Sequence, residues 1–385
     1  MRLPFHFAHV SAGFIAVLVG YTSSAAIIFQ AAAAAGASVP EMNSWMWALG
    51  LGMGATCIGF SLRYRQPILT AWSTPGAALL VTALAGVSMS EAIGVFLFSS
   101  SLILLCGVTG WFDRIMQLVP ASLAAAMLGG VLLTFGLDLF ASAQTQPWLV
   151  GAMLFTYLAL RRSLPRYVIP LSLCAGVAVA ASLGLLHFEQ FAWQLAWPVL
   201  MPPSFSLASL IGIGIPLFVV TMASQNVPGI AVLRAHDYQV KASPLISWTG
   251  VTGVLLAPFG GFAFNLAAIS AAVCMGKEVD ADPAERYKAA VWAGVFYLLM
   301  GLFGATVVGL FAVLPRELVM AIAGLALLGT IGNSLSVALS NERERDAALL
   351  TFMITASGVA LFGIGSAFWG LLVGGIVHGL NSRHR

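Results

Sequence analysis

Two stretches of the sequence, about half the chain apart, combine a preceding proline, an aromatic residue and a residue that often caps helices. The first runs from Thr70 to Leu80 and the second from Gly260 to Ser270. Each leads into a helix of small residues that is too short to cross a bilayer alone. Irregular backbone at membrane depth occurs only where protein buries it or where it lines a cavity. Paired interruptions of this kind in two halves of a chain predict the binding site of a transporter.

The first stretch carries the features of a helix start. Thr74 is predicted to cap a helix whose first position is Pro75, where the missing N–H costs nothing. The first N–H groups of that helix lack intrahelical partners and, with the helix dipole, favour an anion. A simpler interpretation is that these residues only satisfy the helix end. The site residues predicted here are Trp72, Ser73, Thr74, Pro75 and Gly76.

The second stretch offers Asn265 as a cap for a helix that would enter from the opposite face. Two helix starts would then converge near the middle of the membrane and receive a small anion such as a carboxylate. Neighbouring aromatic and aliphatic side chains, Phe262 among them, favour an apolar body on that anion, or else pack against other helices. No Lys or Arg lies inside a predicted span to bind the anion by charge. The site residues predicted here are Phe264, Asn265, Leu266 and Ala267.

Polar residues also cluster within two apolar spans. Such clusters are costly in lipid unless they face a cavity or hydrogen-bond to a neighbouring helix, and the sequence leaves both interpretations open. Asp138, near the outer end of its span, is a weak candidate for a proton carrier, and an interfacial carboxylate is the simpler interpretation. The two clusters, both predicted to contact substrate, are Ser224, Gln225 and Asn226, and Tyr21, Thr22 and Ser24.

The composition is that of an integral membrane protein. Hydrophobic residues make up 60% of the 385 residues and charged residues 8%, against about 25% charged in a soluble domain. Apolar runs long enough to span the bilayer recur throughout, and we predict fourteen membrane segments. With the N-terminus inside, sixteen of the seventeen Lys and Arg residues fall on the cytoplasmic side, which predicts that both termini are cytoplasmic. The four cysteines lack metal-binding spacing, and neither a metal nor a cofactor is expected.

Fourteen segments divide into two sets of seven, and an odd number per half gives an inverted repeat. The stretch from Pro120 to Gly129 matches that from Pro315 to Gly324 at Pro, Leu, Ala and Gly positions. We therefore predict an all-α polytopic membrane protein in which segments 3 and 10 are broken. It forms a single membrane unit, 1–385, with repeat one at about 10–186 and repeat two at about 207–381.

Over essentially its full length, the chain resembles the bacterial BenE family of benzoate/proton symporters. The motifs that carry this resemblance are Thr70 to Gly76, Thr221 to Gly229, Asn341 to Ala348 and Gly363 to Gly370. The resemblance implies uptake of benzoate with protons across the bacterial inner membrane.

The arrangement is also similar to the uracil-transporter fold, shared more distantly with sulfate and bicarbonate transporters. There, segments 3 and 10 are short strands that lead into half-helices. This likeness implies a core domain of segments 1–4 and 8–11, at about 10–110 and 207–314. It moves against a gate domain of segments 5–7 and 12–14, at about 120–186 and 318–381.

The chain departs from the nucleobase carriers of that fold, which typically hold the base with glutamates in the eighth and tenth segments. The matching stretches here offer Ser224, Gln225, Asn265 and Ala267. The absence of both acids argues against a nucleobase and removes repulsion against a carboxylate. It also removes the obvious proton site, so the proton as coupling ion is implied by the family alone.

We therefore expect a secondary transporter, not an enzyme, that takes up benzoate or a related aromatic carboxylate with protons by alternating access. The alternatives are a nucleobase or inorganic-anion carrier on the same fold and a passive anion channel. The partners expected are the small aromatic acid and membrane lipid, without nucleic acid. By analogy with the relatives of this fold, which are often dimeric, a homodimer is the assembly to be tested.

Overall fold

The computed structural model describes residues 7–112, 120–165, 167–186, 193–277, 279–362 and 366–383. Within these ranges the chain is mostly helical. Six of the described helices are long and apolar enough to cross a membrane, or up to eight if each of two bent helix pairs is one span. The predicted class, a helical polytopic membrane protein, is confirmed at this level of detail.

The described part of the chain contains helices of very different lengths and two short strands. The first half contains α1 (Phe7–Ala34), α2 (Val39–Tyr64), β1 (Thr70–Trp72), α3 (Thr74–Ala83), α4 (Met89–Thr109), α6 (Ala121–Thr145), α7 (Pro147–Leu160) and α8 (Val168–Ser182). An interrupted helix follows, made of α9 (Leu207–Ser209), the π-helical η2 (Leu210–Gly214), α10 (Ile215–Thr221), the π-helical η3 (Met222–Asn226) and α11 (Val227–Ala235). The remaining elements are α12 (Ala242–Leu256), η4 (Ala257–Phe259), β2 (Phe264–Leu266), α13 (Ile269–Val273), η5 (Pro283–Glu285), α14 (Tyr287–Leu302), α15 (Gly304–Val313), α16 (Arg316–Leu339), η6 (Glu342–Glu344), α17 (Arg345–Ala356) and α18 (Ser366–Arg383).

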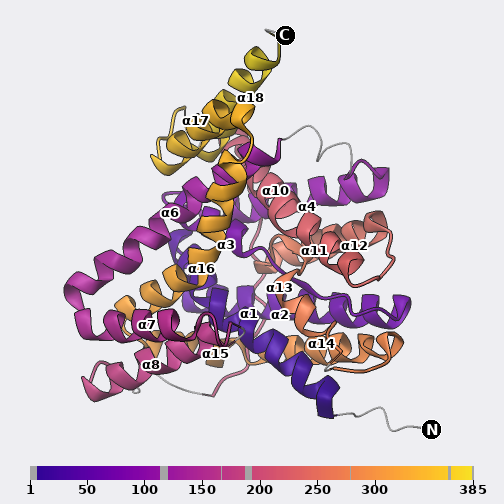
Figure 1. Cartoon of the computed structure of the whole chain (residues 1–385), viewed down its shortest axis with the longest axis vertical. Coiled ribbons are helices and arrows are strands. Elements are labelled where there is room, and N and C mark those ends of the chain that lie inside the picture. Colours follow the sequence, from indigo (N-terminus) through magenta and orange to yellow (C-terminus); the bar gives the residue numbers. More distant parts are fainter. Residues whose placement is uncertain are drawn as a thin grey trace.

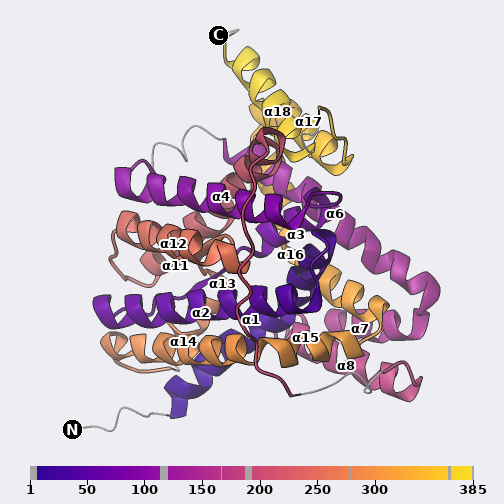
Figure 2. The same ribbon diagram turned by 180° about the vertical axis from the view of Figure 1, so that it is seen from behind.

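The helices pack in two groups, which lie on opposite sides of the molecule in Figures 1 and 2. In one group α2 packs on α14 and α4 packs on α12. In the other, α6 packs on α16 and α17, and α7 packs on α8. Helix α1 contacts α3, α13 and α14 as well as α8 and α16, so it lies between the groups.

Glycines allow α2 and α14 to approach closely. Gly50 lies against Gly301 where these helices cross, and a methyl group on either residue would overlap backbone atoms of the facing helix. Such contacts between small residues hold helices together in lipid, where no hydrophobic force drives their association. The outward faces instead carry large apolar side chains, such as Trp148 and Phe155, which are 79% and 74% exposed.

The two broken stretches meet in a short antiparallel ribbon. Strand β1 pairs with β2, and Thr70 stands opposite Leu266. Two more backbone hydrogen bonds, of 3.1 and 2.9 Å, extend the ladder past its two ends. The two stretches were predicted to be equivalent positions of an internal repeat, and in the structure they are hydrogen-bonded to each other.

Side chains from flanking helices satisfy the outer edges of this ribbon. On the β1 side, the Cys57 sulfur lies 3.1 Å from the Thr70 backbone nitrogen, and the hydroxyl oxygens of Thr56 and Thr70 are 2.6 Å apart. On the β2 side, the Leu266 N–H donates to Asn226 Oδ1 at 2.9 Å. Unpaired backbone groups are costly at membrane depth, so these contacts stabilise the ribbon where it lies.

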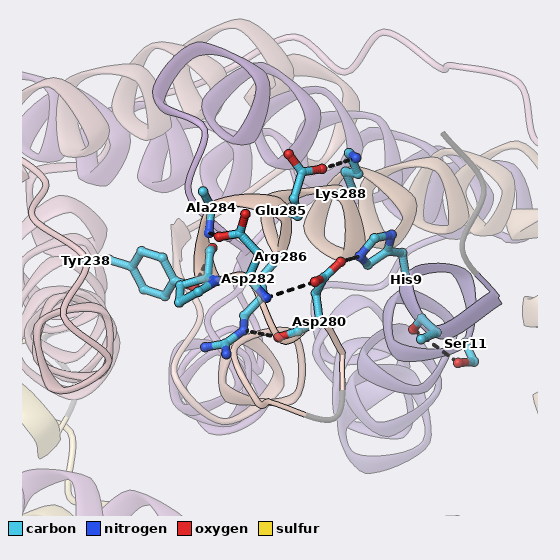
Figure 3. A network of polar contacts seen from close by, with 11 residues as sticks. His9, Ser11, Tyr238, Asp280, Asp282, Ala284, Glu285, Arg286 and Lys288 are labelled. Carbon is cyan, nitrogen blue, oxygen red and sulfur yellow. Dashed lines mark hydrogen bonds and ion pairs between the residues drawn. The ribbon is translucent and has the colours of Figure 1, made fainter. Parts of the chain in front are cut away.

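A network of polar contacts ties the chain after α13 to the start of α1 (Figure 3). His9 Nε2 lies 2.9 Å from Asp280 Oδ2, and His9 is only 1% exposed. Arg286 donates from Nε to the Asp280 carbonyl at 2.8 Å and from Nη1 to the Met275 carbonyl at 2.9 Å. Asp280 thus contacts His9 near the start of α1 and Arg286 directly before α14. The network therefore fixes the segment that follows α13 relative to the starts of α1 and α14.

Candidate functional site

A cavity of about 530 Å³ lies where β1, the start of α3, η3, α13, α14 and α16 meet. Its volume falls within the ~300–1,000 Å³ of typical small-molecule sites. Seven of the residues predicted from the sequence line it: Ser24, Trp72, Thr74, Pro75, Ser224, Gln225 and Ala267. The other eight are not part of its lining: Tyr21, Thr22, Ser73, Gly76, Asn226, Phe264, Asn265 and Leu266.

Helix α3 begins one position earlier than predicted. Ser73, not Thr74, is the N-cap, and its Oγ accepts the Gly76 N–H at 3.0 Å. The Ser73 N–H belongs to the extended ladder of the ribbon, and this bond keeps residue 73 in the extended backbone that a cap requires. Thr74 therefore becomes the first helical residue and Pro75 the second, and both line the cavity.

The prediction that Asn265 caps a helix is wrong. Asn265 is the middle residue of β2, and its Nδ2 donates to the Ala263 carbonyl at 3.0 Å. Helix α13 begins only at Ile269, and Ala268 at its N-cap provides no side-chain hydrogen bond. Pairing with β1 holds the backbone extended to the end of β2, so a helix can start only beyond the ladder.

The aromatic wall predicted in the second stretch is also misplaced. Phe264 is 1% exposed and packs on Gly52 of α2, where a methyl group would overlap its ring. Phe262 joins a buried cluster with Trp45 and Phe96, at ring-centroid distances of 5.7 and 5.1 Å. Both rings therefore pack against helices, Phe264 against α2 and Phe262 against α2 and α4.

Trp72 is the aromatic residue that the first stretch contributes to the cavity. Its Nε1 donates to Ser24 Oγ at 2.8 Å, and Ser24 Oγ donates to the Gly20 carbonyl at 2.7 Å. Tyr21 packs edge-on against the indole, with ring centroids 4.8 Å apart, and Thr22 donates to a carbonyl of its own helix at 2.8 Å. Of the first-span cluster, therefore, Ser24 reaches the cavity and the other two support α1.

The π-helical turn η3 divides three consecutive polar residues between two roles. Ser224 and Gln225 line the cavity. Asn226 is fully buried and accepts the Leu266 N–H, so it positions β2. A π-helical turn is wider than an α-helical one and occurs often at functional sites. In η3, the adjacent side chains of Gln225 and Asn226 therefore face the cavity and β2, respectively.

Four polar residues of the cavity were missed by sequence reasoning: Ser270, Tyr297, Thr330 and Asn333. Tyr297 of α14 is 2% exposed, and its hydroxyl is within hydrogen-bonding reach of Ser270. Thr330 and Asn333 lie on α16, three residues apart and hence on one face of that helix. This spacing, in an otherwise apolar span, is the signal that could have identified them.

The described residues that line the cavity carry no formal charge, because none of them is Asp, Glu, Lys, Arg or His. Asp138, the weak proton candidate, is partly buried in α6 and is not among them. Arg166 follows the lining residue Pro165 but lies outside the described ranges. In the part of the chain that the structure describes, no group of three or more His, Cys, Asp and Glu residues is placed to hold a metal.

This fold is one already known among membrane transporters. Over 96% of its length the chain matches the transmembrane domain of a cyanobacterium bicarbonate transporter, BicA, with a TM-score of 0.57, 11% identity and 98% of that chain covered. It also matches the murine Solute Carrier 26 family member A9 anion transporter in the inward-facing state, with a TM-score of 0.61 and 10% identity, over 100% of this chain and 69% of that one. At these identities the likeness shows the fold alone.

The sequence assigns the family within that fold. Residues 3–380 match the family BenE, described as benzoate membrane transport protein, and the chain belongs to this family. It is 51% identical over 367 residues to the "Inner membrane protein YdcO" of Escherichia coli (strain K12), covering 95% of this chain and 94% of the relative. It is 40% identical over 363 residues to a "Benzoate membrane transport protein" of Acinetobacter baylyi, covering 94% and 92%. The resemblance seen in the sequence motifs is thus confirmed, and the protein is a membrane transporter of the BenE family.

Proposed function

We propose that this transporter takes up benzoate or a closely related aromatic acid, together with a proton, across the bacterial inner membrane. The family description and the name of the relative from Acinetobacter baylyi support the substrate class. The observation that carries the proposal for this chain is the cavity at the paired broken stretches, which combines hydroxyl and amide groups with an aromatic wall. Sites of this mixed character suit a small ligand with a polar end and an apolar body.

The substrate's carboxyl group lies, in this proposal, between the starts of α3 and α13. Thr74 and Ser270 provide hydroxyl groups there, and Gln225 provides an amide. The aromatic ring then packs against Trp72, whose indole is held by its bond to Ser24. Support for this orientation comes from the position of these groups around one cavity. None of the described lining residues is Asp or Glu, which would repel a carboxylate.

Transport proceeds, in this proposal, by alternating access within a fourteen-segment, 7+7 inverted repeat. The core domain at about 10–110 and 207–314 moves against the gate domain at about 120–186 and 318–381. The packing of helices in two groups, with a cavity bounded by α3 and η3 on one side and α16 on the other, supports this division. In this proposal both termini are cytoplasmic, and the arginine-rich loop that contains the lining residue Pro165 faces the cytoplasm.

Uptake of radiolabelled benzoate into proteoliposomes tests this function. An inward acid gradient should produce accumulation above that in protein-free liposomes, and the latter control is required because the neutral acid crosses bilayers unaided. Excess unlabelled benzoate should compete, whereas uracil and sulfate should not. A matched control is protein with Thr74→Trp, which fills the cavity and should reduce uptake to the protein-free level.

The rival functions give distinct results in the same experiment. Accumulation of labelled uracil or sulfate, with no accumulation of benzoate, would assign a nucleobase or inorganic-anion carrier and refute the proposal. Flux that never saturates and ignores the proton gradient would instead identify a passive channel. Oligomeric state, for which we propose a homodimer by analogy with the fold's relatives, is measured by the mass of the detergent-solubilised protein.

A further inference from the structure

The polar lining of the cavity consists of groups that both donate and accept hydrogen bonds. Gln225 and Asn333 have side-chain amides, and hydroxyl groups come from Thr74, Ser224 and Ser270. A carboxylate only accepts hydrogen bonds, whereas a neutral carboxylic acid donates one through its O–H and accepts through its C=O. The lining therefore matches the neutral acid at least as well as its anion.

The start of α3 provides fewer donors for an anion than an ordinary helix start. Pro75 has no N–H, and the Gly76 N–H already donates to Ser73 Oγ at 3.0 Å. The next N–H, that of Ala77, donates to the Ser73 carbonyl at 2.7 Å. In the first turn this leaves the Thr74 N–H for a ligand. Helix α13, with five residues, adds only a short dipole.

Among the described residues, the titratable side chains in and directly behind the lining are phenols and thiols, which are uncharged near neutral pH. On the packed elements they are Tyr297 of α14 in the lining itself and, behind it, Tyr21 of α1, Cys57 of α2 and Cys274 after α13. None of the described charged groups on these elements is part of the lining: Glu41 and Arg63 in α2, Asp138 in α6, Arg161 and Arg162 after α7, Arg234 in α11, Lys288 in α14, Arg316 and Glu317 in α16, and the network of His9, Asp280 and Arg286.

An ionised carboxylate in such a site would give up its hydration without gaining a cationic partner among the described lining residues. Desolvation of this kind disfavours the charged form of a carboxyl group and raises its pKa. We propose that the cavity binds the aromatic acid in its neutral, protonated form, so that the proton transported is the substrate's own carboxyl proton. This inference rests on the proposed function and adds to it the form of the substrate.

Two consequences follow for transport. One proton accompanies each acid molecule, because the O–H bond stays intact from entry to release, and the acid ionises again only in water. The loaded transporter carries no additional charge, so the pH difference drives uptake and the electrical potential does not.

Binding of three ligands to the purified protein tests the protonation state. The ligands are benzoate, uncharged benzamide and permanently anionic benzenesulfonate, and equilibrium dialysis with radiolabelled benzoate measures occupancy. For a carboxyl group with a pKa near 4, the apparent Kd for total benzoate should rise about tenfold per pH unit from about pH 5.5 to about pH 7.5. Benzamide should compete equally at every pH, and benzenesulfonate should not compete.

A substitution that adds charge provides the second test. Asn333→Lys places an ammonium group at the cavity and should flatten the pH dependence and admit benzenesulfonate. Ser340→Lys is the matched control: Ser340 is exposed at the end of the same helix, two turns away and outside the lining, so the steep pH dependence should persist. A pH-independent Kd for benzoate in the unsubstituted protein, with competition by benzenesulfonate, would overturn the inference while leaving benzoate transport intact. Failure of benzoate to bind at any pH would refute the proposed function itself.

Discussion

Replacing Asn226 by alanine should destabilise the protein through β2. The Asn226 side chain is fully buried, and its Oδ1 accepts the Leu266 N–H at 2.9 Å. Alanine leaves that N–H without an acceptor at the edge of the ribbon. A buried donor without a partner costs about 1–3 kcal/mol, so we expect a loss of about 2 kcal/mol in the free energy of unfolding. That corresponds to about 30-fold in the folding equilibrium constant.

Its neighbour Gln225 should behave in the opposite way. Gln225 lines the cavity and has no hydrogen-bond partner among the described residues. Gln225→Ala should therefore leave the melting temperature unchanged while removing one bond to the ligand, about 1 kcal/mol or about fivefold in benzoate affinity. Asn226→Ala should lower the melting temperature in the absence of ligand.

Thermal unfolding in detergent with a thiol-reactive dye measures both effects. Three of the four cysteines, Cys57, Cys106 and Cys274, are free and buried, so they react only on unfolding. The exposed Cys174 gives a constant background. If Asn226→Ala melts like the unsubstituted protein while Gln225→Ala melts early, the assignment of Asn226 to the ribbon and Gln225 to the cavity is wrong.

Three further substitutions test the architecture. Ser73→Ala should cost about 1–2 kcal/mol of stability and weaken benzoate binding, because the cap that fixes the start of α3 is lost; Ser88→Ala removes a comparable cap from α4 and should leave affinity unchanged. Gly50→Leu should abolish the close packing of α2 on α14 and the yield of folded protein in size-exclusion chromatography. In contrast Gly59→Ala, in the same helix with no atoms nearby, should stabilise by up to about 1 kcal/mol. Asn265→Ala should leave benzoate affinity within about twofold, measured by fluorescence titration, since Asn265 does not line the cavity; a tenfold loss would restore it to the site.

The membrane helices were predictable because the signal for them is local. Hydropathy over some twenty residues determines whether a segment can span the bilayer, and six of the described helices are long and apolar enough to do so. The start of α3 was predicted to within one residue, because proline and a capping residue mark a helix start within a few positions. The error of one residue arose because the Ser73 N–H donates to the carbonyl of Ala263, a residue distant in the sequence that directly precedes β2.

The second half of the site depends on contacts that are distant in the sequence. Asn265 has the chemistry of a cap, but pairing with β1 overrides that preference and keeps it in a strand. Asn226 is an uncharged polar residue like its neighbours Ser224 and Gln225, so the sequence does not indicate that it has a different role. The wider turn of η3 directs its side chain toward β2 and theirs toward the cavity. Tyr297 and Asn333 are single polar residues in apolar spans, and the packing of α14 and α16 around the ribbon decides that they meet.

The pairing of β1 with β2 also sets an order for biosynthesis. The Cys57 and Thr56 contacts of β1 come from the first half of the chain, whereas the strand that completes its backbone hydrogen bonds comes from the second half. Until β2 is synthesised, the backbone N–H and C=O groups of β1 that pair with it have no partner, which would cost several kcal/mol for each group exposed to lipid. We therefore expect the insertion machinery or bound water to hydrogen-bond these groups, or to keep them away from lipid, until β2 pairs with β1. The candidate site, which both halves of the chain line, is therefore complete only after β2 has paired with β1.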